Sequence, residues 1–385
     1  MRQGYLYFII ELSKQPPVIR CFASKSTWIE GDAIRQLEQA AGLTGVKIAV
    51  GLPDLHPGMG IPVGAAFLVD NRIYPHLIGS DAGCGVGLWQ TKLKSNKIKR
   101  DRWAKKLNGL EFPWEGDTYA WLQHHNCTAI DFIDAHGTIG GGNHFAELQR
   151  IERIHDADRF DELELTKNRL FLMVHSGSRG LGQRILREHT DRFKASGLPD
   201  DSDEARAYLQ QHDQALQWAE SSRALIAHRF AEQLGTTCDL VLDLCHNSVT
   251  RIDTQELAGW LHRKGAMPSD RPVGVVPGSR GDLSYLIEAV GDQQQNLWSL
   301  AHGAGRKWNR ASCKGRIREK FNAAGLSHTP LGSLVICDDA ALLYEEAPQA
   351  YKNIESIINE MIADGLINVI ATLRPLITYK VRKNR

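Results

Sequence analysis

The residues around Cys84 have the composition of a tight metal-binding turn. Cys84 stands between Gly83 and Gly85, and glycine lacks the side-chain bulk that would keep a thiolate away from a neighbouring group. Asp81 lies three residues earlier, so one turn can direct a carboxylate and a thiolate at the same ion. A buried free cysteine in a glycine turn is the alternative, because buried cysteines are common. The segment by itself only suggests a metal site.

A glycine-rich stretch precedes a second group of possible ligands. Residues 137–147 read Gly-Thr-Ile-Gly-Gly-Gly-Asn-His-Phe-Ala-Glu, so three consecutive glycines come directly before Asn143 and His144. Backbone N–H groups in such a run can converge on an anion, and the missing side chains let a ligand approach the main chain. A flexible turn with solvated polar residues is the alternative. His144 and Glu147 beside the glycines favour a binding site.

Three further stretches combine glycines with a guanidinium group. They are 175–182 (His-Ser-Gly-Ser-Arg-Gly-Leu-Gly), 276–281 (Val-Pro-Gly-Ser-Arg-Gly) and 302–306 (His-Gly-Ala-Gly-Arg). The fork of arginine matches phosphate oxygens, and Gly-Ser backbones can form nests around anions. One such turn is common, but three of them favour a shared polyanionic ligand.

The possible ligands together fit a transition metal. They are Asp81, Cys84, His144, His175 and His246, while His302 stands apart in its own glycine loop. Imidazole, thiolate and carboxylate donors together favour a first-row transition metal over calcium or magnesium, and Cys84 can bridge two ions. The donor types leave the metal open, because softness favours zinc while Mn²⁺ binds such sites more weakly.

Segment 92–106 is the clearest local concentration of positive charge. It contains six lysines and two arginines, in a chain whose 46 lysines and arginines nearly balance its 45 aspartates and glutamates. A run of this kind is usually a solvated face, but it also suits an RNA backbone. Most remaining histidines, and the other cysteines, lack comparable neighbours, and we interpret them as surface or core residues.

The composition is that of an ordinary globular protein. A chain of 385 residues with 42% hydrophobic residues can bury a substantial core. The early apolar run Tyr5–Ile10 is too short for a signal peptide or a membrane span. The seven dispersed cysteines include no CxxC pair, which indicates reduced thiols. We therefore expect a cytoplasmic protein with no membrane partner.

Periodicity predicts three scaffold helices, over 31–41, 203–234 and 351–364. The apolar runs Leu170–Val174 and Leu240–Leu244 have strand character and lead into His175 and, through Cys245, into His246. Loops at strand ends are where rigid scaffolds hold chemistry. We predict one α+β domain over 1–385 with mixed, mostly antiparallel sheets. We also expect a helical insertion or hinge near 195–235, most readily at Ala195–Asp203.

In their order along the chain, these segments resemble the signature blocks of the RtcB family of RNA ligases. The resemblance extends from about Leu52 to Lys380. It also includes Pro53-Asp54-Leu55-His56, His246-Asn247 and Glu346-Ala-Pro-Gln-Ala-Tyr351-Lys352. Any one block can arise by chance, whereas the ordered set is specific. It implies a single RtcB-like catalytic domain built around a central metal and nucleotide cleft.

The resemblance implies a GTP-dependent ligase with two Mn²⁺ ions per active site, for which zinc and cobalt are alternatives. The family's ligands match Asp81, Cys84, His144, His175 and His246, with the cysteine bridging the ions. The histidine matching His302 attacks the α-phosphorus of GTP and becomes a histidine-GMP adduct. Asp54 matches an acid that supports the site, and Arg179 suits RNA or pyrophosphate oxygens by type.

The implied reaction joins an RNA 2′,3′-cyclic phosphate or 3′-phosphate end to a 5′-hydroxyl end. A water molecule first opens the cyclic form to a 3′-phosphate, and GMP passes to that phosphate. GMP leaves when the 5′-hydroxyl attacks. Tyr351 resembles a stacking platform for the base, and Glu147 can accept hydrogen bonds from guanine. The nucleotide-binding positions match Asn143, Phe145, Glu147, Asn247, Pro277, Gly278, Ser279, Arg280, Ser284, Gly303, Ala304, Gly305, Tyr351 and Lys380.

The chain departs from the commoner family pattern at Ser248-Val249, at Arg280 and at 307–310, and it is shorter. The metal and histidine positions are intact, so we expect activity with an altered RNA-facing surface. The compact pattern resembles a branch whose members accompany a release-factor homologue and are thought to reseal ribosomal RNA. We therefore expect a monomer that acts in RNA repair.

Two other functions stay open on the sequence. A metal-dependent cyclic phosphodiesterase or hydrolase without ligation would use the same metals and arginines. It would need neither GTP nor a nucleophilic imidazole in a glycine loop, so His302 discriminates against it. A non-catalytic RNA-binding module is the second alternative, and the intact ligand set argues against it.

Overall fold

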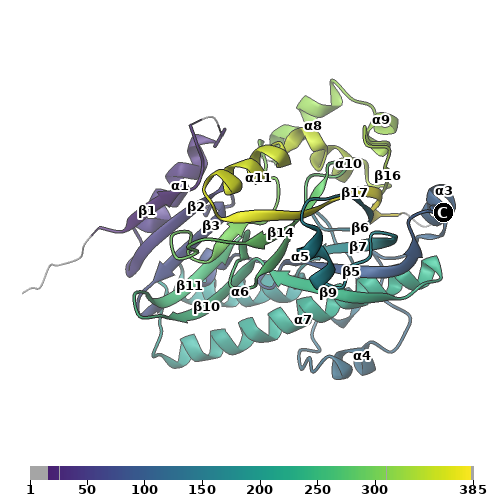
Figure 1. Cartoon of the computed structure of the whole chain (residues 1–385). Helices are drawn as coiled ribbons and strands as arrows, with labels where there is room; N and C mark the ends of the chain where they lie inside the picture. Colours follow the sequence, from purple (N-terminus) through teal and green to yellow (C-terminus); the bar gives the residue numbers. More distant parts are fainter. Residues whose placement is uncertain (1–15, 26, 309, 383–385) are drawn as a thin grey trace, which may run out of the picture.

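The computed structural model describes residues 16–25, 27–308 and 310–382, which form two large sheets with helices packed around them (Figure 1). The apolar run Tyr5–Ile10 lies outside the described residues. No helix among the described residues is both long and apolar enough to cross a bilayer.

The larger sheet contains eight strands in the order β13-β14-β17-β6-β7-β5-β9, with β16 added to β17. Its pairs are antiparallel except for β16 with β17. The strands span Gly85–Lys94 (β5), Phe145–Ile154 (β6), Arg169–Ser176 (β7), Cys238–Cys245 (β9), Val273–Val276 (β13), Ser284–Ala289 (β14), Leu334–Cys337 (β16) and Ile367–Val381 (β17).

The smaller sheet contains five strands in the order β1-β2-β3-β11-β10, and β1 with β2 is its one parallel pair. Its strands span Val18–Cys21 (β1), Val46–His56 (β2), Val63–Val69 (β3), Asn247–Asp253 (β10) and Ala258–Lys264 (β11). Two short ribbons pair Arg72–Ile73 (β4) with Leu198–Pro199 (β8), and Ala266–Pro268 (β12) with Ser299–Ala301 (β15).

Helices cover the outer faces of the sheets. They span Gly31–Ala41 (α1), Pro75–Ile78 (α2), Arg100–Lys106 (α3), Thr118–His124 (α4), Ala157–Glu162 (α5), Gly180–Phe193 (α6), Asp203–Leu234 (α7), Arg310–Arg318 (α8), Ala323–Ser327 (α9), Ala340–Glu345 (α10) and Ile354–Ala363 (α11), with 3-10 turns at Ile133–Ala135 and Pro348–Ala350.

The long helix α7 closes one side of the core. Ser202 caps its start by accepting from the N–H of Ala205, and Gly235 ends it in the left-handed conformation at φ 71°. Ile226 and Phe230 of α7 pack against Leu170 and its neighbours on β7. Alternate β7 residues such as Phe171 face a second core beneath β14 and β17, because strand side chains alternate between faces.

Most of the predicted architecture is confirmed. The fold is α+β with mostly antiparallel sheets, and α1 and α7 have the predicted bounds. The third predicted helix begins at Ile354 rather than at Tyr351, because Asn353 caps it by accepting from the N–H of Glu355. The predicted hinge region contains β8 and α7, and its mobility stays a prediction.

Candidate metal centre and nucleotide cleft

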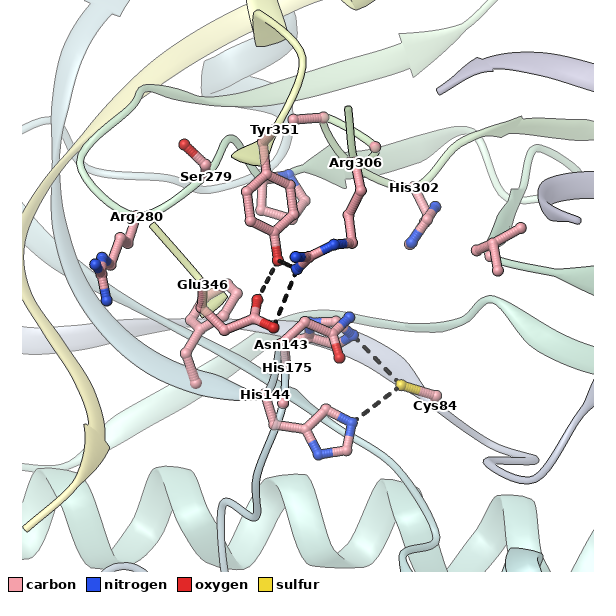
Figure 2. Close-up of a pocket in the computed structure, with 18 of the residues that line it drawn as sticks. Cys84, Asn143, His144, His175, Ser279, Arg280, His302, Arg306, Glu346 and Tyr351 are labelled. Carbon is pink, nitrogen blue, oxygen red and sulfur yellow. Dashed lines mark hydrogen bonds and ion pairs between the residues drawn. The ribbon is translucent and has the colours of Figure 1, made fainter. Parts of the chain in front are cut away.

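Cys84 lies buried at the centre of the candidate metal site, where a turn enters β5 (Figure 2). Its Sγ is 3.5 Å from Nε2 of His144 and 3.3 Å from Nε2 of His175. A Cβ on Gly83 would lie 2.9 Å from the Cβ of Ala219 on α7, and one on Gly85 would overlap the Leu244 carbonyl oxygen. Glycines on both sides therefore let this turn press against α7 and β9, which fixes the thiol.

The other predicted metal ligands converge on Cys84 from separate elements. His144 ends the glycine loop before β6, His175 is the penultimate residue of β7, and His246 lies between β9 and β10. The donor atoms form two groups, Cys84 with His175 and His246, and Asp81 with Cys84 and His144, each within 4.8 Å. Both groups contain Cys84, so one sulfur is shared. Their chemistry fits transition-metal binding.

Burial sets the protonation of this cluster. It raises the pKa of the Cys84 thiol well above its usual range, and the charge of Asp81 raises that pKa further. Burial also lowers the pKa values of His175 and His246 well below their usual range, with help from neighbouring histidines. The imidazoles are therefore neutral, which is the form that binds a metal. The thiol needs a nearby cation to lose its proton.

Asp81 and Arg179 hold His144 in place. Burial raises the pKa of Asp81, but the hydrogen bond and charge of His144 outweigh burial, so the pKa lies below its usual value. Asp81 Oδ2 is 3.0 Å from His144 Nε2, and Asp81 Oδ1 accepts from the Arg179 N–H at 3.2 Å. The Arg179 guanidinium donates to the Ile139 carbonyl at 3.0 Å and lies 3.4 Å from His144 Nδ1. The structure thus places Arg179 behind His144 rather than in the cleft wall.

A buried arginine anchors the metal end of the cleft to α7. Arg223 pairs with Asp243 of β9 through contacts of 2.8 and 2.5 Å. It also donates to the carbonyl oxygens of Gly83 and Ser176, at 2.7 and 2.9 Å. One guanidinium therefore joins the Cys84 turn, the end of β7 and β9.

His302 faces the metal cluster from the loop after β15. Its Nδ1 lies 2.7 Å from Oδ2 of Asp54, which also accepts from the His302 backbone N–H at 3.2 Å. Asp54 is fully buried. With Nδ1 held by a carboxylate, the proton of the neutral ring stays on Nδ1 and the lone pair on Nε2 is available. The His302 ring centre is 4.7 Å from that of His246, so the available nitrogen lies beside the metal ligands.

Lys352 supports the Asp54 segment from behind. Its ammonium is buried and donates to the carbonyl oxygens of Pro53 and Leu55, at 3.0 and 2.8 Å, on both sides of Asp54. Burial lowers the pKa of Lys352 to about 8, and the charge of Asp54 opposes this shift. The Lys352 N–H also donates to the Gly305 carbonyl at 2.9 Å. Lys352 therefore ties the acid to the loop that carries His302.

The predicted nucleotide positions surround a cavity of about 430 Å³ that adjoins the metal cluster. Of the fourteen positions, Ser284 alone does not line this cavity. It lies behind the wall, and its Oγ accepts from Nε2 of Gln149 at 2.9 Å. Asn247 lines the cavity, but its amide is bonded to the backbone of Asp81 and Gly265, at 3.0 and 2.7 Å.

Glu147 and Lys380 form the floor of the cavity beside β17. Burial raises the pKa of Glu147 to about 7, although Thr378 and Gln149 donate hydrogen bonds to its carboxyl group. Nζ of Lys380 donates to the His144 carbonyl at 2.9 Å. Glu147 therefore changes charge near neutral pH, at a position that lines this end of the cleft.

Tyr351 and Arg306 form the opposite wall with Glu346 (Figure 2). The Arg306 guanidinium lies 5.1 Å from the centre of the Tyr351 ring and 3.2 Å from both the Tyr351 hydroxyl and a Glu346 oxygen. The Tyr351 hydroxyl also donates to Glu346. Arg280 is buried and donates to the Leu343 carbonyl at 2.5 Å, so it joins this wall to α10. The three predicted guanidinium groups are thus each held by protein partners.

Sequence reasoning overlooked Arg223, Asp243 and Gln149 and gave Lys352 no role. Arg223 lies in the middle of a long polar-faced helix, where nothing local marks it as special. The one sequence signal for Lys352 was a charged residue directly after Tyr351. At the other departures from the family pattern, Ser248 is buried in β10 and Lys307 N–H donates to the Ala350 carbonyl at 2.7 Å, while residue 309 lies outside the described residues.

Known proteins resemble this chain over most of its length. A family model described as tRNA-splicing ligase RtcB matches residues 36–129 and 118–381. The chain is 48% identical to RNA-splicing ligase RtcB2 of Escherichia coli over 361 residues, which covers 93% of this chain and 94% of that protein. It is 28% identical to tRNA-splicing ligase RtcB of Archaeoglobus fulgidus, with 90% and 91% covered. RNA-splicing ligase RtcB of Mycobacterium tuberculosis is also 28% identical, with 89% and 99% covered.

Proposed function

This chain belongs to the RtcB family of RNA ligases, and from that premise we propose that it joins RNA ends through a GMP adduct on His302. The substrates are an RNA 2′,3′-cyclic phosphate or 3′-phosphate end and a 5′-hydroxyl end, with GTP as the second substrate. The contact of 2.7 Å between Asp54 and Nδ1 of His302 is the observation that supports this proposal most directly. A hydrolase would need no such activated imidazole.

The donor set fits the two divalent cations that the family resemblance implies, with Mn²⁺ as the expected metal. Asp81, Cys84 and His144 would hold one ion, and Cys84, His175 and His246 the other. Bound there, the cations would neutralise phosphate oxygens and keep Cys84 as a thiolate.

The first step is the attack of His302 Nε2 on the α-phosphorus of GTP. The N–P bond forms while the bond from the α-phosphorus to the bridging oxygen breaks, and pyrophosphate leaves with that electron pair. The ring keeps its proton on Nδ1, where the Asp54 carboxylate stabilises the positive charge. Lys352 holds Asp54 in place during this change.

The second step transfers the GMP group to RNA, and the third step joins the two RNA ends. An oxygen of the RNA 3′-phosphate attacks the phosphorus of the adduct, and His302 leaves as a neutral imidazole. A 2′,3′-cyclic phosphate is opened by water to the 3′-phosphate before this transfer. The 5′-hydroxyl then attacks the activated 3′-phosphorus, the new P–O bond forms as the bond to the GMP oxygen breaks, and the hydroxyl proton passes to solvent as GMP leaves. Tyr351 offers a stacking face for guanine, and Glu147 an acceptor for its N–H groups. Because the compact sequence pattern resembles one branch of the family, we propose that the protein acts in RNA repair. Its proposed target is cleaved ribosomal RNA, and it would act in functional association with a release-factor homologue.

The decisive experiment detects the adduct. Protein loaded with Mn²⁺ is mixed with GTP labelled at the α-phosphorus, and we expect a protein-bound label that is stable to alkali and labile to acid. His302→Ala should abolish the label, whereas His328→Ala, a change outside the cleft, should retain it. Metal content measured on the same samples shows that both variants are loaded. A label that persists in His302→Ala, or its absence from loaded wild-type protein, would refute the proposal.

A further inference from the structure

We propose that an exposed basic face on α3 and the turn before it binds the phosphate backbone of the RNA substrate outside the cleft. The basic face consists of Lys94, Lys97, Lys99, Arg102, Lys105 and Lys106. The identity of the ligand as RNA rests on the proposed function. The location and charge of the face do not.

Charge is strongly concentrated on this face. Segment 92–106 contains eight lysines and arginines and a single acid, Asp101, although the 46 basic and 45 acidic residues of the chain nearly balance. Lys92 pairs with Asp239, and Arg100 lies 3.6 Å from Asp101. Within the described part of the chain, none of the six residues of the basic face is in an ion pair. Their charges are therefore available to a polyanion.

The face is held rigidly by its buried side. Trp103 and Ala104 of α3, with Leu107 directly after it, pack into the core shared by α7 and the larger sheet. The Leu107 carbonyl accepts from the Arg382 guanidinium at 2.7 Å. The backbone of the face is therefore ordered before binding, and the conformational entropy lost on binding is mainly that of the basic side chains.

The surface around these cations is hollowed in two places. One hollow is lined by Lys94, Lys97 and Lys106, among others, and the other by Arg100, Arg150 and Arg374. Lys99 and Arg102 line both hollows, so they form the ridge between them. Arg374 is bonded to Glu152 by two contacts of 2.6 Å. Concave basic surfaces of this kind can follow a sugar-phosphate chain.

The face is remote from the reacting groups. Strand β5 begins beside Cys84 and ends at Lys94, which at about 3.3 Å per residue separates them by about 30 Å. Ala146 and Leu148 of β6 share a core with Trp103, while Phe145 and Glu147 line the cleft, so the two sites lie on opposite faces of the sheet. Lys380 of the cleft and Arg382 mark a path between them around the end of β17, beside which α3 lies in Figure 1.

RNA suits this face better than an acidic protein does. Its six residues are five lysines and one arginine, and lysine is depleted in protein interfaces. Exposed lysines are typical contacts to phosphates, which they neutralise with release of counterions. A stacked strand rises about 3.4 Å per nucleotide, so about nine nucleotides would cover the separation from the cleft.

The test compares two variants with the same loss of charge. The triple variant K97Q/K99Q/R102Q removes two lysines and one arginine from the basic face. K25Q/R187Q/K194Q removes the same residue types from exposed positions elsewhere. Affinity for RNA with a 3′-phosphate is measured against salt for oligonucleotides of about 4 and about 20 nucleotides. The same proteins are assayed for the GMP adduct.

The expected result is selective for the long RNA. The K97Q/K99Q/R102Q variant should reduce the slope of log affinity against log salt by about 2 to 3 for the long RNA, with the short RNA unchanged. A slope equal to that of wild type, an equal loss with the control variant, or an equal loss for both RNAs would overturn the proposal. A slope equal to that of wild type would leave an acidic protein as the partner of the basic face. Loss of the adduct in wild-type protein would refute the ligation mechanism alone, because the salt dependence reports the basic face independently.

Discussion

The two ends of the cleft are held together in different ways. At the metal end, strands β5, β7 and β9 position Cys84, His175 and His246 directly, and Arg223 locks those strands to α7. At the nucleotide end, Arg306 of the loop after β15 contacts Glu346 and Tyr351, and Arg280 of the loop after β13 donates to the Leu343 carbonyl. Near it, residues such as Ile317, Val335 and Leu343 form a small hydrophobic cluster of their own.

The metal end is therefore built on paired strands, whereas the wall at the nucleotide end is built from loops. Metal ligation tolerates little displacement, which explains why its donors sit on or directly beside paired strands. On the proposed function this wall meets GTP and then RNA, and a wall built from loops can rearrange its contacts between the two. The departures from the family pattern fall at both ends, because Arg280 lines the nucleotide end and Ser248 lies two residues after His246 at the metal end.

Replacing one arginine at each end of the cleft tests the difference between the two ends most directly. Arg223→Met leaves the Asp243 carboxylate buried without its partner, and we expect the free energy of unfolding to fall by about 3–5 kcal/mol. Arg306→Met removes a guanidinium of the same type from Glu346, and its effect should stay local to residues 313–347. Denaturant unfolding gives the global value, and hydrogen exchange gives the local one. Equal global losses in the two variants would contradict the division into two ends.

The variant Lys352→Met tests whether the Lys352 ammonium supports Asp54 where the two ends of the cleft meet. Without the ammonium, the carbonyls of Pro53 and Leu55 lose their donor and Asp54 is less well held. We expect adduct formation to slow by about 10–100-fold, as for other residues that orient reactive groups indirectly. Metal content and the KM for GTP should be unchanged, and Lys352→Arg should recover part of the rate. A loss of bound metal in Lys352→Met would instead indicate a general structural role.

The smallest expected effect concerns pH at the nucleotide end. The pKa of Glu147 is raised to about 7 by burial, so its carboxyl group is largely protonated below that pH. Guanine N–H groups need the ionised form as acceptor, and guanosine affinity should therefore rise about tenfold between pH 6 and pH 8. Guanosine is used because it lacks phosphates that titrate in this range.

The control for the pH experiment is Glu147→Gln, which keeps the size of the side chain and removes its titration. Calorimetry at pH 6, 7 and 8 should show weaker binding by this variant with no rise over the range. A rise of the same size in Glu147→Gln would assign the pH dependence to another group.

The sequence was most informative where chemistry is encoded locally. Glycines around Cys84 signalled close packing, the glycine run before His144 signalled a ligand site, and the structure brings all five predicted metal ligands together. The supporting residues had no such signal, because their contacts span the chain. Lys352 is 299 positions from Pro53, and Arg223 is 140 positions from Gly83. Pairings of this kind depend on the topology of the sheets, which periodicity alone does not specify.

Helix ends show the same contrast on a smaller scale. The end of α7 was predictable because Gly235 adopts a left-handed conformation that few other residues tolerate. The start of α11 was misplaced by three residues, because Tyr351–Asn353 lie between the 3-10 turn at Pro348–Ala350 and the first turn of the helix. The Asn353 side chain caps the helix, and this signal for its start is not part of the apolar spacing.

On the proposed function one metal ion binds each donor group, and the sulfur that the two groups share makes the two binding equilibria thermodynamically linked. The Cys84 proton is firmly bound in the buried thiol, and whichever ion arrives first must displace it. The second ion then meets a thiolate already formed, together with the charge of the first. Loading should therefore release one proton from this residue per pair of ions, and the two equilibria cannot be described by independent binding constants.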